Sequence, residues 1–485
     1  MEMKNLKPAL VWQIFDEINQ VPRPSKKEGK IREWLVAFAQ KHGLEYKVDE
    51  IGNVAMWRPA APGFENAKKV VLQAHMDMVC EKVDGSNHNF DTDPIQTIVE
   101  GEWVRANGTT LGADDGMGMA GALACLIDPD LKVGAIQGLF TVDEETGLTG
   151  ASNVGEGMIV GDYLLNMDSE DDGVITIGCA GGIDTLATFS YTPQEAPKDL
   201  NYFKLRIAKL QGGHSGTDIG LERGNATKFM VRLLWELGQK CCFKLADIQA
   251  GNLRNAIAHT AEAVVGVKPE DKETLAVVFN TVAAELKDEY RHSEKDMEIT
   301  CVAVDAPATV VECPVAQAVI NAAFVVPHGV ISMSLDVEGL TETSTNLASV
   351  KIIEPGKIEV VTSQRSAVES RKYELAHRIE TLFKMAGGEV RHTDGYQGWA
   401  PNPESKLLKI AVTDWKKLYG VEPTVEAIHA GLECGLFLKV APHMEMISYG
   451  PTLKDVHSPK ERVHIPAVQK FWDFTVAMLH TIAQG

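Results

Sequence analysis

Histidines or carboxylates that could bind a metal occur at five places in the chain, where the neighbouring sequence is mostly apolar, rich in glycine or rich in turn residues. They are His75-x-Asp77, Asp114-Asp115, Glu144-Glu145, Asp168 and His457. Imidazole nitrogens and carboxylate oxygens bind divalent ions such as zinc, manganese and cobalt. That many carboxylates in one crevice would repel one another strongly unless cations lay among them. The residue types therefore predict a metal centre, provided that the fold brings the five places together.

The elements next to these residues indicate that they meet at one edge of a sheet. Residues 70–77 form a short run, rich in β-branched side chains, that is typical of a buried strand and ends in His-x-Asp. Buried strands are also expected at 136–142 and 162–167, each followed at once by acidic residues, and Asp114 precedes an expected helix at 117–126. In open α/β sheets, ligands bind at the carboxyl ends of the strands. We therefore expect these side chains to be neighbours.

A centre with two metals needs more ligands than these strands supply. Two ions about 3.5–4 Å apart require a shared carboxylate and terminal ligands on either side. The second histidine is His457, in a turn-rich loop that follows an expected strand at 444–448. The sequence thus contains enough candidate ligands for a pair of ions.

The order of these motifs resembles that of a known family. Similar motifs occur in the same order in the co-catalytic zinc peptidases, which include carnosinase, aminoacylase and glutamate carboxypeptidase. The segments Leu-Gly-Ala-Asp, Cys-Ala-Gly-Gly-Ile-Asp, Gly-Gly-His-Ser-Gly and Asn-Leu-Arg-Asn-Ala-Ile-Ala are similar to segments of that group as well. The resemblance extends over nearly the whole chain.

The resemblance implies two bound zinc ions, with cobalt or manganese as alternatives. It makes His75 and Asp168 the terminal ligands of one ion. It makes Glu145 and His457 the terminal ligands of the other, with Asp114 as the bridge between them. A hydroxide that bridges the two ions would be the nucleophile.

The resemblance also implies roles for two carboxylates that do not bind metal. Asp77 would orient His75, since zinc-bound histidines usually give their other N–H to a carboxylate. Glu144 would be the general base, which takes a proton from the attacking water and passes it to the leaving amine. Adjacent residues at a strand end point in different directions, so Glu145 can bind metal while Glu144 faces that water.

The segment after Asp114 leaves two alternatives. Many relatives have a lysine shortly after the bridging aspartate, and this chain has none there, so Asp115 remains an alternative bridge. The run Gly116-x-Gly118-x-x-Gly121 is also literally a dinucleotide-binding fingerprint. However, no apolar strand leads directly into it, and two aspartates stand where a pyrophosphate would bind. We therefore expect these glycines to let a helix pack closely on the sheet.

A second domain is predicted where the pattern changes. We expect an α/β catalytic domain, formed by 1–185 and 396–485, whose mostly parallel sheet is flanked by helices. Residues 186–395 would form an inserted α+β lid and dimerisation domain, built from two βαβ-like units. Its expected strands are 203–210, 263–267, 331–335 and 357–362, and its expected helices are 225–239, 273–290, 314–324 and 370–385.

Three residues of the inserted domain are candidates for substrate binding. His214 lies in Gly-Gly-His-Ser-Gly, where the glycines let the backbone approach a ligand closely. A lone histidine there is more often a simple loop residue, but relatives use it to polarise the scissile carbonyl. Arg365 is either a surface arginine or a bidentate clamp for the free carboxylate of a peptide. Asn255 is a further candidate for a hydrogen bond to substrate.

Other polar residues are interpreted as structural. Ser25 and Glu28 have the spacing of a capping box, which predicts the start of a helix that Gly43 ends. His429 and Glu433 are assigned no role in the site.

Size and composition limit the class of protein. The chain of 485 residues is too long for one core, and its net charge of −20 argues against nucleic acid or an anionic membrane as a partner. Eight cysteines without a CxxC motif indicate a reduced, intracellular protein. The sequence shows no signal peptide and no apolar run of about 18 residues, so we expect a cytoplasmic location.

The resemblance implies the function of a metal-dependent dipeptidase that acts on short, unblocked dipeptides, including those that end in histidine. The same centre would also suit an N-acyl amino acid deacylase. A metal-binding interaction protein without catalysis is a further alternative, against which the complete set of ligands and base argues. Relatives are often dimers through the inserted domain, so a homodimer is expected, with a monomer as the alternative.

Overall fold

The computed structural model describes residues 3–485, which form two compact units. The first unit comprises the chain up to Cys179, together with Trp399–Ala427 and Leu432–Gly485. The second comprises Ala180–Gly398 and Ile428–Gly431. The sequence-based division, with boundaries at 185/186 and 395/396, instead assigned Ile428–Gly431 to the first domain.

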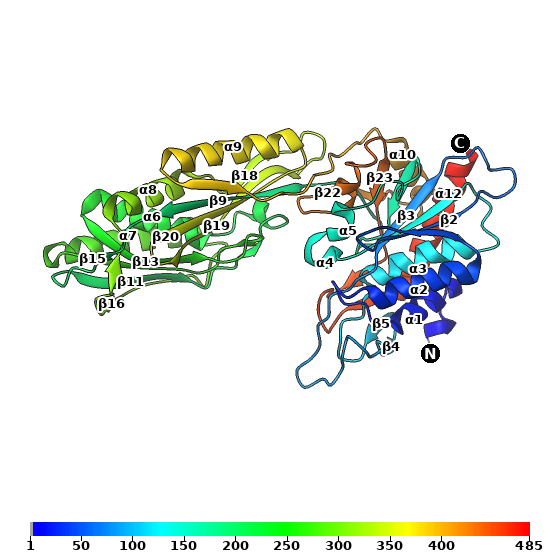
Figure 1. Cartoon of the computed structure of the whole chain (residues 1–485), viewed down its shortest axis with the longest axis horizontal. Coiled ribbons are helices and arrows are strands. Elements are labelled where there is room, and N and C mark those ends of the chain that lie inside the picture. The colour runs from blue at the N-terminus through cyan, green and yellow to red at the C-terminus, as the bar shows by residue number, and fades with distance from the viewer. Residues whose placement is uncertain (1–2) are drawn as a thin grey trace. The chain divides into compact units, whose positions relative to one another are not determined.

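An eight-stranded sheet lies at the centre of the first unit (Figure 1), in the order β1-β2-β6-β3-β7-β23-β8-β22. The four strands β6, β3, β7 and β23 are parallel to their neighbours within this group. Strands β1 and β2 on one side and β8 on the other pair antiparallel. The bounds are β1 Glu45–Val48, β2 Val54–Arg58, β3 Val70–His75, β6 Ile136–Thr141, β7 Tyr163–Asn166, β8 Val174–Cys179, β22 Thr424–Ile428 and β23 Glu445–Ser448.

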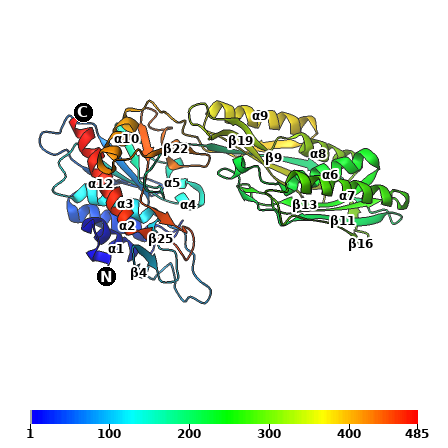
Figure 2. The same cartoon turned by 180° about the vertical axis from the view of Figure 1, so that it is seen from behind.

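The parallel strands are apolar because helices cover both faces of such a sheet. Every residue of β3 and β6 is buried. The principal helices of the unit, some of which are clearer from behind (Figure 2), are α1 Ala9–Asn19, α2 Gly29–His42, α3 Ala113–Ile127, α10 Lys406–Tyr419 and α12 Ile465–Gln484. Shorter elements are α4 Glu144–Gly147, α5 Thr149–Ser152 and α11 Glu433–Phe437, and a small sheet of β4 Thr97–Glu100, β5 Trp103–Ala106, β24 Leu453–Lys454 and β25 Arg462–His464.

The glycines at the start of α3 pack against aromatic rings. A Cβ at Gly121 would lie 2.7 Å from a ring carbon of Phe471 on α12, and a Cβ at Gly116 would lie 2.9 Å from the ring of Phe15 on α1. Both distances are too short for carbon atoms in contact. The glycine pattern therefore serves close packing, as expected, but of α3 against α1 and α12 and not of a helix on the sheet.

The start of α2 differs from the prediction, whereas its end agrees. Helix α2 begins after Glu28 and has no side-chain cap. The Ser25 hydroxyl instead donates to Asp77 Oδ2 (2.8 Å), and Glu28 Oε1 accepts from the backbone N–H groups of Lys26 and Asp143. The predicted capping box is therefore wrong. The Ser25 side chain binds the buried carboxylate of Asp77, and the Glu28 side chain accepts from backbone N–H groups of a turn instead of capping the helix. Gly43 ends the helix in the left-handed conformation, at φ 68°.

The second unit is built on a nine-stranded sheet in the order β16-β11-β15-β13-β19-β20-β9-β21, with β18 on β19. Its strands are β9 Gly181–Ser190, β11 Asn201–Ala208, β13 Phe243–Gly251, β15 Ala261–Val267, β16 Glu298–Val304, β18 Gly329–Met333, β19 Thr341–Glu354, β20 Lys357–Ser366 and β21 Glu389–His392. Its helices are α6 Ala226–Lys240, α7 Lys272–Glu289, α8 Cys313–Val325 and α9 Glu369–Met385. Two short pairs, β10 Gln194–Glu195 with β17 Thr309–Val310 and β12 Gly213–His214 with β14 Ala256–Ile257, complete the unit.

The two expected βαβ-like units of this second sheet are present in a split form, β11-α6-β13 and β15-α7-β16. Neighbouring strands of the sheet pair antiparallel throughout the described residues. Helix α6 joins β11 to β13, and β15 lies between these two strands. Because β11 and β13 both pair antiparallel with β15, they run in the same direction, as in a βαβ unit, but they are not adjacent. Pairing of this kind depends on distant segments, which a local pattern of strands and helices does not reveal.

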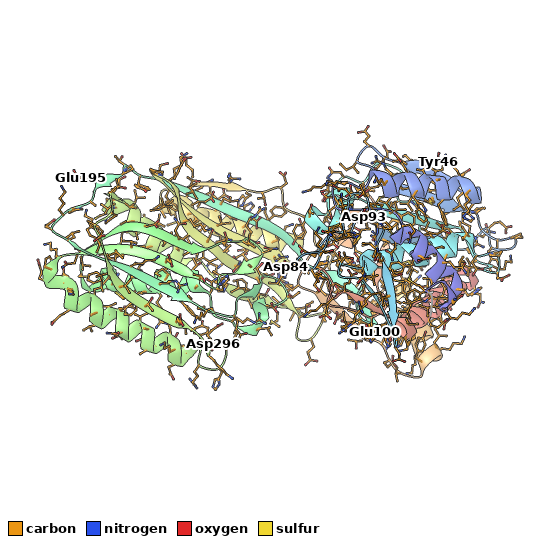
Figure 3. All side chains as sticks on the ribbon, turned by 90° about the horizontal axis from the view of Figure 1, so that it is seen from below. Tyr46, Asp84, Asp93, Glu100, Glu195 and Asp296 are labelled. Carbon is orange, nitrogen blue, oxygen red and sulfur yellow. The ribbon has the colours of Figure 1, made fainter. Side chains whose placement is uncertain are left out.

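The surface carries the excess of negative charge. Acidic side chains such as Asp84, Glu100, Glu195 and Asp296 project from the two units into solvent (Figure 3). All eight cysteines are free thiols. Among residues 3–485, no helix is both long and apolar enough to cross a membrane.

Candidate metal centre

The carboxyl edge of the parallel strands in the first unit gathers the predicted ligands. His75 is the last residue of β3, Glu144 and Glu145 begin α4 just after β6, and Asp168 follows β7. The other two come from the start of α3 and from the loop between β24 and β25. Asp143, immediately before α4, has a φ of 49°, a left-handed conformation that turns the chain sharply as it leaves β6.

Each carboxylate oxygen of Asp114 lies close to one of the two histidines. Its Oδ1 lies 3.0 Å from His75 Nε2, and its Oδ2 lies 3.0 Å from His457 Nε2. Asp168 Oδ1 is 3.6 Å from His75 Nε2. Glu145 Oε2 is 3.1 Å from His457 Nε2. The five side chains thus form two groups of ligand atoms that share one aspartate.

The charges and pKa values of this cluster favour the binding of cations. Burial, and then the nearby carboxylates of Asp115 and Asp114, raise the pKa of Asp168 well above its ordinary value. Contacts with Asp114 and Glu145 raise the pKa of His457 to about 11. The negative charge around the histidines thus favours their protonated form. Bound divalent ions would neutralise this charge in place of the protons.

The donor atoms also have the arrangement that a metal requires. Ligand atoms of His75, Asp114 and Glu145 all lie within 4.8 Å of one another. Glu145 Oε1 is buried and has no hydrogen-bond partner among the described residues. A buried polar atom without a partner is costly unless something binds it. Two histidines and three carboxylates with a shared aspartate fit a pair of divalent cations.

Asp115 has a different position from its neighbour. Its Oδ2 accepts from the backbone N–H of His75 (3.3 Å), and its Oδ1 accepts from that of Gly118 (3.0 Å). Both oxygens are therefore used by the backbone near the start of α3. Asp114, not Asp115, lies between the two histidines.

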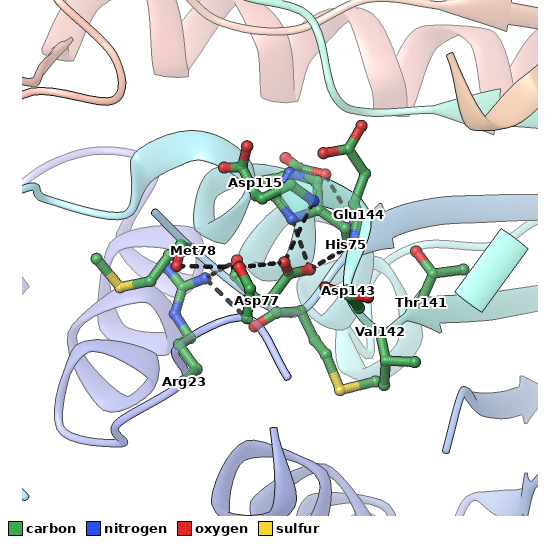
Figure 4. A network of polar contacts seen from close by, with 12 residues as sticks. Arg23, His75, Asp77, Met78, Asp115, Thr141, Val142, Asp143 and Glu144 are labelled. Carbon is green, nitrogen blue, oxygen red and sulfur yellow. Dashed lines mark hydrogen bonds and ion pairs between the residues drawn. The ribbon is translucent and has the colours of Figure 1, made fainter. Parts of the chain in front are cut away.

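Asp77 ties the histidine at the end of β3 to the turn after β6 (Figure 4). It is fully buried, and its Oδ1 lies 3.4 Å from His75 Nδ1. The backbone N–H groups of Glu144 and Glu145 donate to its two oxygens at 3.0 and 3.3 Å. Burial alone would raise the pKa of Asp77, but the contacts with His75 and Ser25 hold it below its ordinary value. A charged Asp77 thereby fixes both the imidazole ring and the glutamate pair.

Glu144 has the environment of a proton acceptor. Burial, followed by the neighbouring carboxylates of Glu433 and Glu145, raises the pKa of Glu144 to about 8. General bases work best when their pKa lies near the working pH. Cations beside Glu144 would lower its pKa again, so the carboxylate form is accessible near neutrality.

Glu433 lies close to the site, although the sequence interpretation gave it no role. Its Oε2 accepts from Gln73 Nε2 (2.6 Å) and from the Thr141 hydroxyl (2.8 Å). Its Oε1 is buried without a hydrogen-bond partner among the described residues. Burial raises the pKa of Glu433 to about 7. The only signal in the sequence is a charged residue within the otherwise uncharged stretch Ala430–Leu438.

The second unit contains the three residues predicted to bind substrate. The backbone carbonyl of Asn255 accepts from Ser215 N (2.8 Å), and His214 pairs with Ala256 across β12 and β14. The Asn255 side chain is exposed. Arg365 is only 6 % exposed and is therefore not a surface arginine. Its Nη1 donates to the Tyr396 hydroxyl at 2.7 Å.

The tautomer of His214 follows from its neighbours. Its Nδ1 accepts from the backbone N–H groups of Gly216 (3.3 Å) and Thr217 (3.2 Å). Burial, and then the positive charge of Arg365, lower the pKa of His214. A neutral His214 therefore carries its proton on Nε2, which is the form that donates a hydrogen bond from that atom.

Comparison with known proteins gives a consistent picture. Residues 71–481 match the model of peptidase family M20/M25/M40. The chain is 37 % identical over 481 residues to the cytosol non-specific dipeptidase of Escherichia coli (strain K12), a match that covers 99 % of each. The structure superposes on that of the aminoacylhistidine dipeptidase from Vibrio alginolyticus with a TM-score of 0.92 and 41 % identity, over 99 % of this chain and 98 % of that one.

The fold extends to more distant structures. A tripeptidase from Staphylococcus aureus has a TM-score of 0.57 and 16 % identity over the full length of both chains. The family resemblance inferred from the motifs is confirmed by the family match and the two full-length relatives.

Proposed function

The chain belongs to peptidase family M20/M25/M40, and on that basis we propose that it is a metal-dependent dipeptidase acting on short, unblocked dipeptides, including those with a C-terminal histidine. The two full-length relatives are named as a non-specific dipeptidase and an aminoacylhistidine dipeptidase. The observation that carries the proposal is the position of Asp114, with one oxygen 3.0 Å from each histidine.

We propose that this centre holds two divalent ions. His75 and Asp168 would bind one, and Glu145 and His457 would bind the other, with Asp114 shared between them. The mixed nitrogen and oxygen donors favour zinc, with cobalt and manganese as alternatives. Bound zinc would supply Lewis acidity, which lowers the pKa of water and polarises the scissile carbonyl.

The protein's own groups would move the proton. Glu144 accepts a proton from the attacking water at its carboxylate and delivers it to the leaving amine. Asp77 keeps the imidazole of His75 and the turn that carries Glu144 in fixed positions, through the contacts described above. No covalent link between protein and substrate is needed in this scheme.

Residues of the second unit would bind the substrate itself. In our proposal, His214 donates from Nε2 to the oxygen that becomes negative in the transition state. Arg365 pairs with the free carboxylate of the peptide, and Asn255 adds a hydrogen bond. The support is the tautomer of His214 and the burial of Arg365 beside Ser215 and Tyr396.

We further propose a cytosolic homodimer that pairs through the second unit. The Escherichia coli relative is named as a cytosolic enzyme, and free thiols suit a reducing compartment. Strand β18 exposes the apolar side chains of Val330, Ile331 and Met333, of which Met333 is 47 % exposed. Exposed strands of this kind invite pairing with another chain. Light scattering during gel filtration distinguishes a dimer from a monomer.

The test of the function is metal analysis together with a panel of substrates. We expect two metal ions per chain and hydrolysis of Xaa-His dipeptides that a chelator abolishes. Cleavage of acetyl-amino acids in preference to dipeptides would show a deacylase instead. A protein that binds metal but cleaves neither class would be an interaction protein.

A further inference from the structure

A buried glutamate holds the loop that presents the shared aspartate. Glu461 is only 2 % exposed. Its Oε2 accepts from the backbone N–H groups of Leu111 (2.7 Å) and Gly112 (3.0 Å). Its Oε1 accepts from those of Ala113 (2.7 Å) and Asp114 (3.3 Å). One carboxylate thus satisfies four successive backbone donors and ends at the residue between the two histidines.

A buried arginine holds the same loop by its carbonyl groups. Arg23 is 1 % exposed, and its Nη2 donates to the Gly112 carbonyl in a short hydrogen bond. Its Nη1 donates to the carbonyl of Asp77 at 2.8 Å (Figure 4). The same atom donates to the carbonyl of Met76 at 3.4 Å. Arg23 therefore connects the loop before α3 to the end of β3, which carries His75.

The two charges act on opposite ends of one peptide group. In the peptide group between Gly112 and Ala113, the Gly112 carbonyl accepts from Arg23 and the Ala113 N–H donates to Glu461. Hydrogen bonds to charged groups are roughly twice as strong as neutral ones. There is little room for change, because a Cβ at Gly112 would lie 2.5 Å from Arg23 Nη2, and the residue has a φ of 69°. The loop is thereby restricted to one conformation.

Burying the charges of Arg23 and Glu461 costs free energy, and the packing of the core does not require charged side chains at these positions. Burial lowers the pKa of Arg23 and raises that of Glu461, which shows the cost of keeping each of them charged. Apolar side chains of similar volume often stabilise a core as well or better. In the part of the chain that the structure describes, both side chains bond to backbone groups and neither makes a hydrogen bond to a predicted ligand side chain. A role in placing the ligands explains why the charges stand at this position.

We propose that Arg23 and Glu461 are positioning residues that clamp Leu111–Asp114, so that Asp114 stands between the two histidines before any metal binds. The inference rests on the proposed metal centre. Glu461 belongs to the loop that carries His457, and Arg23 is fastened to the end of β3. The clamp thus joins three ligand-bearing segments without using a ligand side chain.

The first test measures zinc affinity of the metal-free protein by calorimetric titration. In Glu461→Gln, the amide nitrogen faces backbone N–H groups, so the loop loses part of its support. We expect zinc affinity to fall by about 10- to 100-fold, as for other partners behind metal ligands. Unchanged affinity in a folded Glu461→Gln would overturn the inference.

A matched control separates positioning from general stability. Glu445→Gln removes a carboxylate of the same unit that accepts from the Ser405 hydroxyl (2.6 Å) and from Leu407 N (3.2 Å), at the start of α10. Among the described residues, its carboxylate makes no hydrogen bond to Leu111–Asp114, to the loop that carries His457 or to the end of β3. We expect its zinc affinity to equal that of the unaltered protein even where its melting temperature falls. An equal loss of affinity in both variants would refute a specific role for the clamp.

The second test needs no variant and applies even if Glu461→Gln does not fold. Hydrogen exchange of the amides of Gly112, Ala113 and Asp114 is measured in the unaltered, metal-free protein. We expect these amides to be protected before zinc is added. Rapid exchange that ends only on adding zinc would mean that the metal orders the loop, contrary to the proposal.

The outcomes also distinguish this inference from the proposed function. If the unaltered protein binds no divalent ion, the metal centre itself is wrong, and the clamp has no ligand to position. If the unaltered protein binds zinc and Glu461→Gln binds it equally well, the function stands and the clamp alone is rejected.

Discussion

At the scale of single residues, Glu144 and Glu145 offer a sharp comparison, because they are adjacent but face different groups. Glu145 Oε2 lies 3.1 Å from His457, whereas Glu144 has no contact of that kind among the described residues. We expect Glu144→Gln to retain its metal content and to lose about 10²- to 10⁴-fold in kcat, since proton transfer contributes that much. Glu145→Gln should lose metal. Steady-state kinetics with metal analysis checks both, and normal turnover by Glu144→Gln would exclude it as the base.

The second residue-scale prediction concerns Glu433 in the metal-free protein. Burial raises the pKa of Glu433 to about 7 from an ordinary value near 4.5. The folded state therefore binds its proton more tightly than the unfolded state does, so this group costs stability as the pH rises from about 4.5 to 7. Above pH 7 the cost is constant, at about 3 kcal/mol.

Glu433→Gln removes that ionisation and should therefore change how stability depends on pH. We expect the variant to be more stable than the unaltered protein at pH 8, by up to about 3 kcal/mol, and nearly equal to it at pH 4.5. Urea unfolding at both pH values measures the difference, and Glu195→Gln on the surface is the control. A constant difference between the variant and the unaltered protein at all pH values would show that Glu433 does not titrate in this range.

The predicted metal ligands were easier to identify from the sequence than the residues that hold them in position. His75 and Asp168 stand at the ends of apolar runs, and the order of the motifs identifies the family. Arg23 stands in Val-Pro-Arg-Pro-Ser, which has no periodicity, and its partners lie far along the chain at Asp77 and Gly112. A role that depends only on such distant contacts leaves no local pattern.

At the scale of elements, α3 depends on glycine for its approach to α12. A Cβ at Gly121 would lie 2.7 Å from the Phe471 ring. Gly121→Ala should therefore lower the free energy of unfolding by about 1–3 kcal/mol, the usual cost of overpacking a core. The control is Gly29→Ala in α2, where nothing lies within 4 Å of the added carbon, so we expect no loss. Urea unfolding of both variants measures the effect, and equal stabilities would contradict close packing at Gly121.

Strands were predicted correctly where burial alone determines the pattern of apolar residues in the sequence. Strands β3, β6 and β7 are buried along their whole length and mostly apolar, because both faces of a parallel sheet are covered. The capping box at Ser25 failed because Asp77, which is remote in sequence, takes its hydroxyl. A tertiary contact overrode the local signal there. In the second unit the βαβ-like succession was predicted, but the strand order in the sheet was not, since β15 inserts between β11 and β13.

At the scale of the whole molecule, each unit has a hydrophobic core of its own. The predicted ligands all belong to the first unit, where buried carboxylates would repel one another without cations. Metal binding to the folded state therefore stabilises one unit directly, by about 2.7 kcal/mol when free metal exceeds its dissociation constant 100-fold.

Scanning calorimetry with and without a chelator tests this expectation. Removal of metal should lower the melting temperature of the first unit by roughly 5–10 °C, given the usual size dependence of such shifts. The transition of the second unit should stay in place, and added zinc should restore the first. Magnesium at the same concentration is the control for ionic strength, because it usually keeps several of its waters and is not held by all-protein cages. If chelation moved both transitions equally, or neither, the cations would not be confined to the five ligands around Asp114.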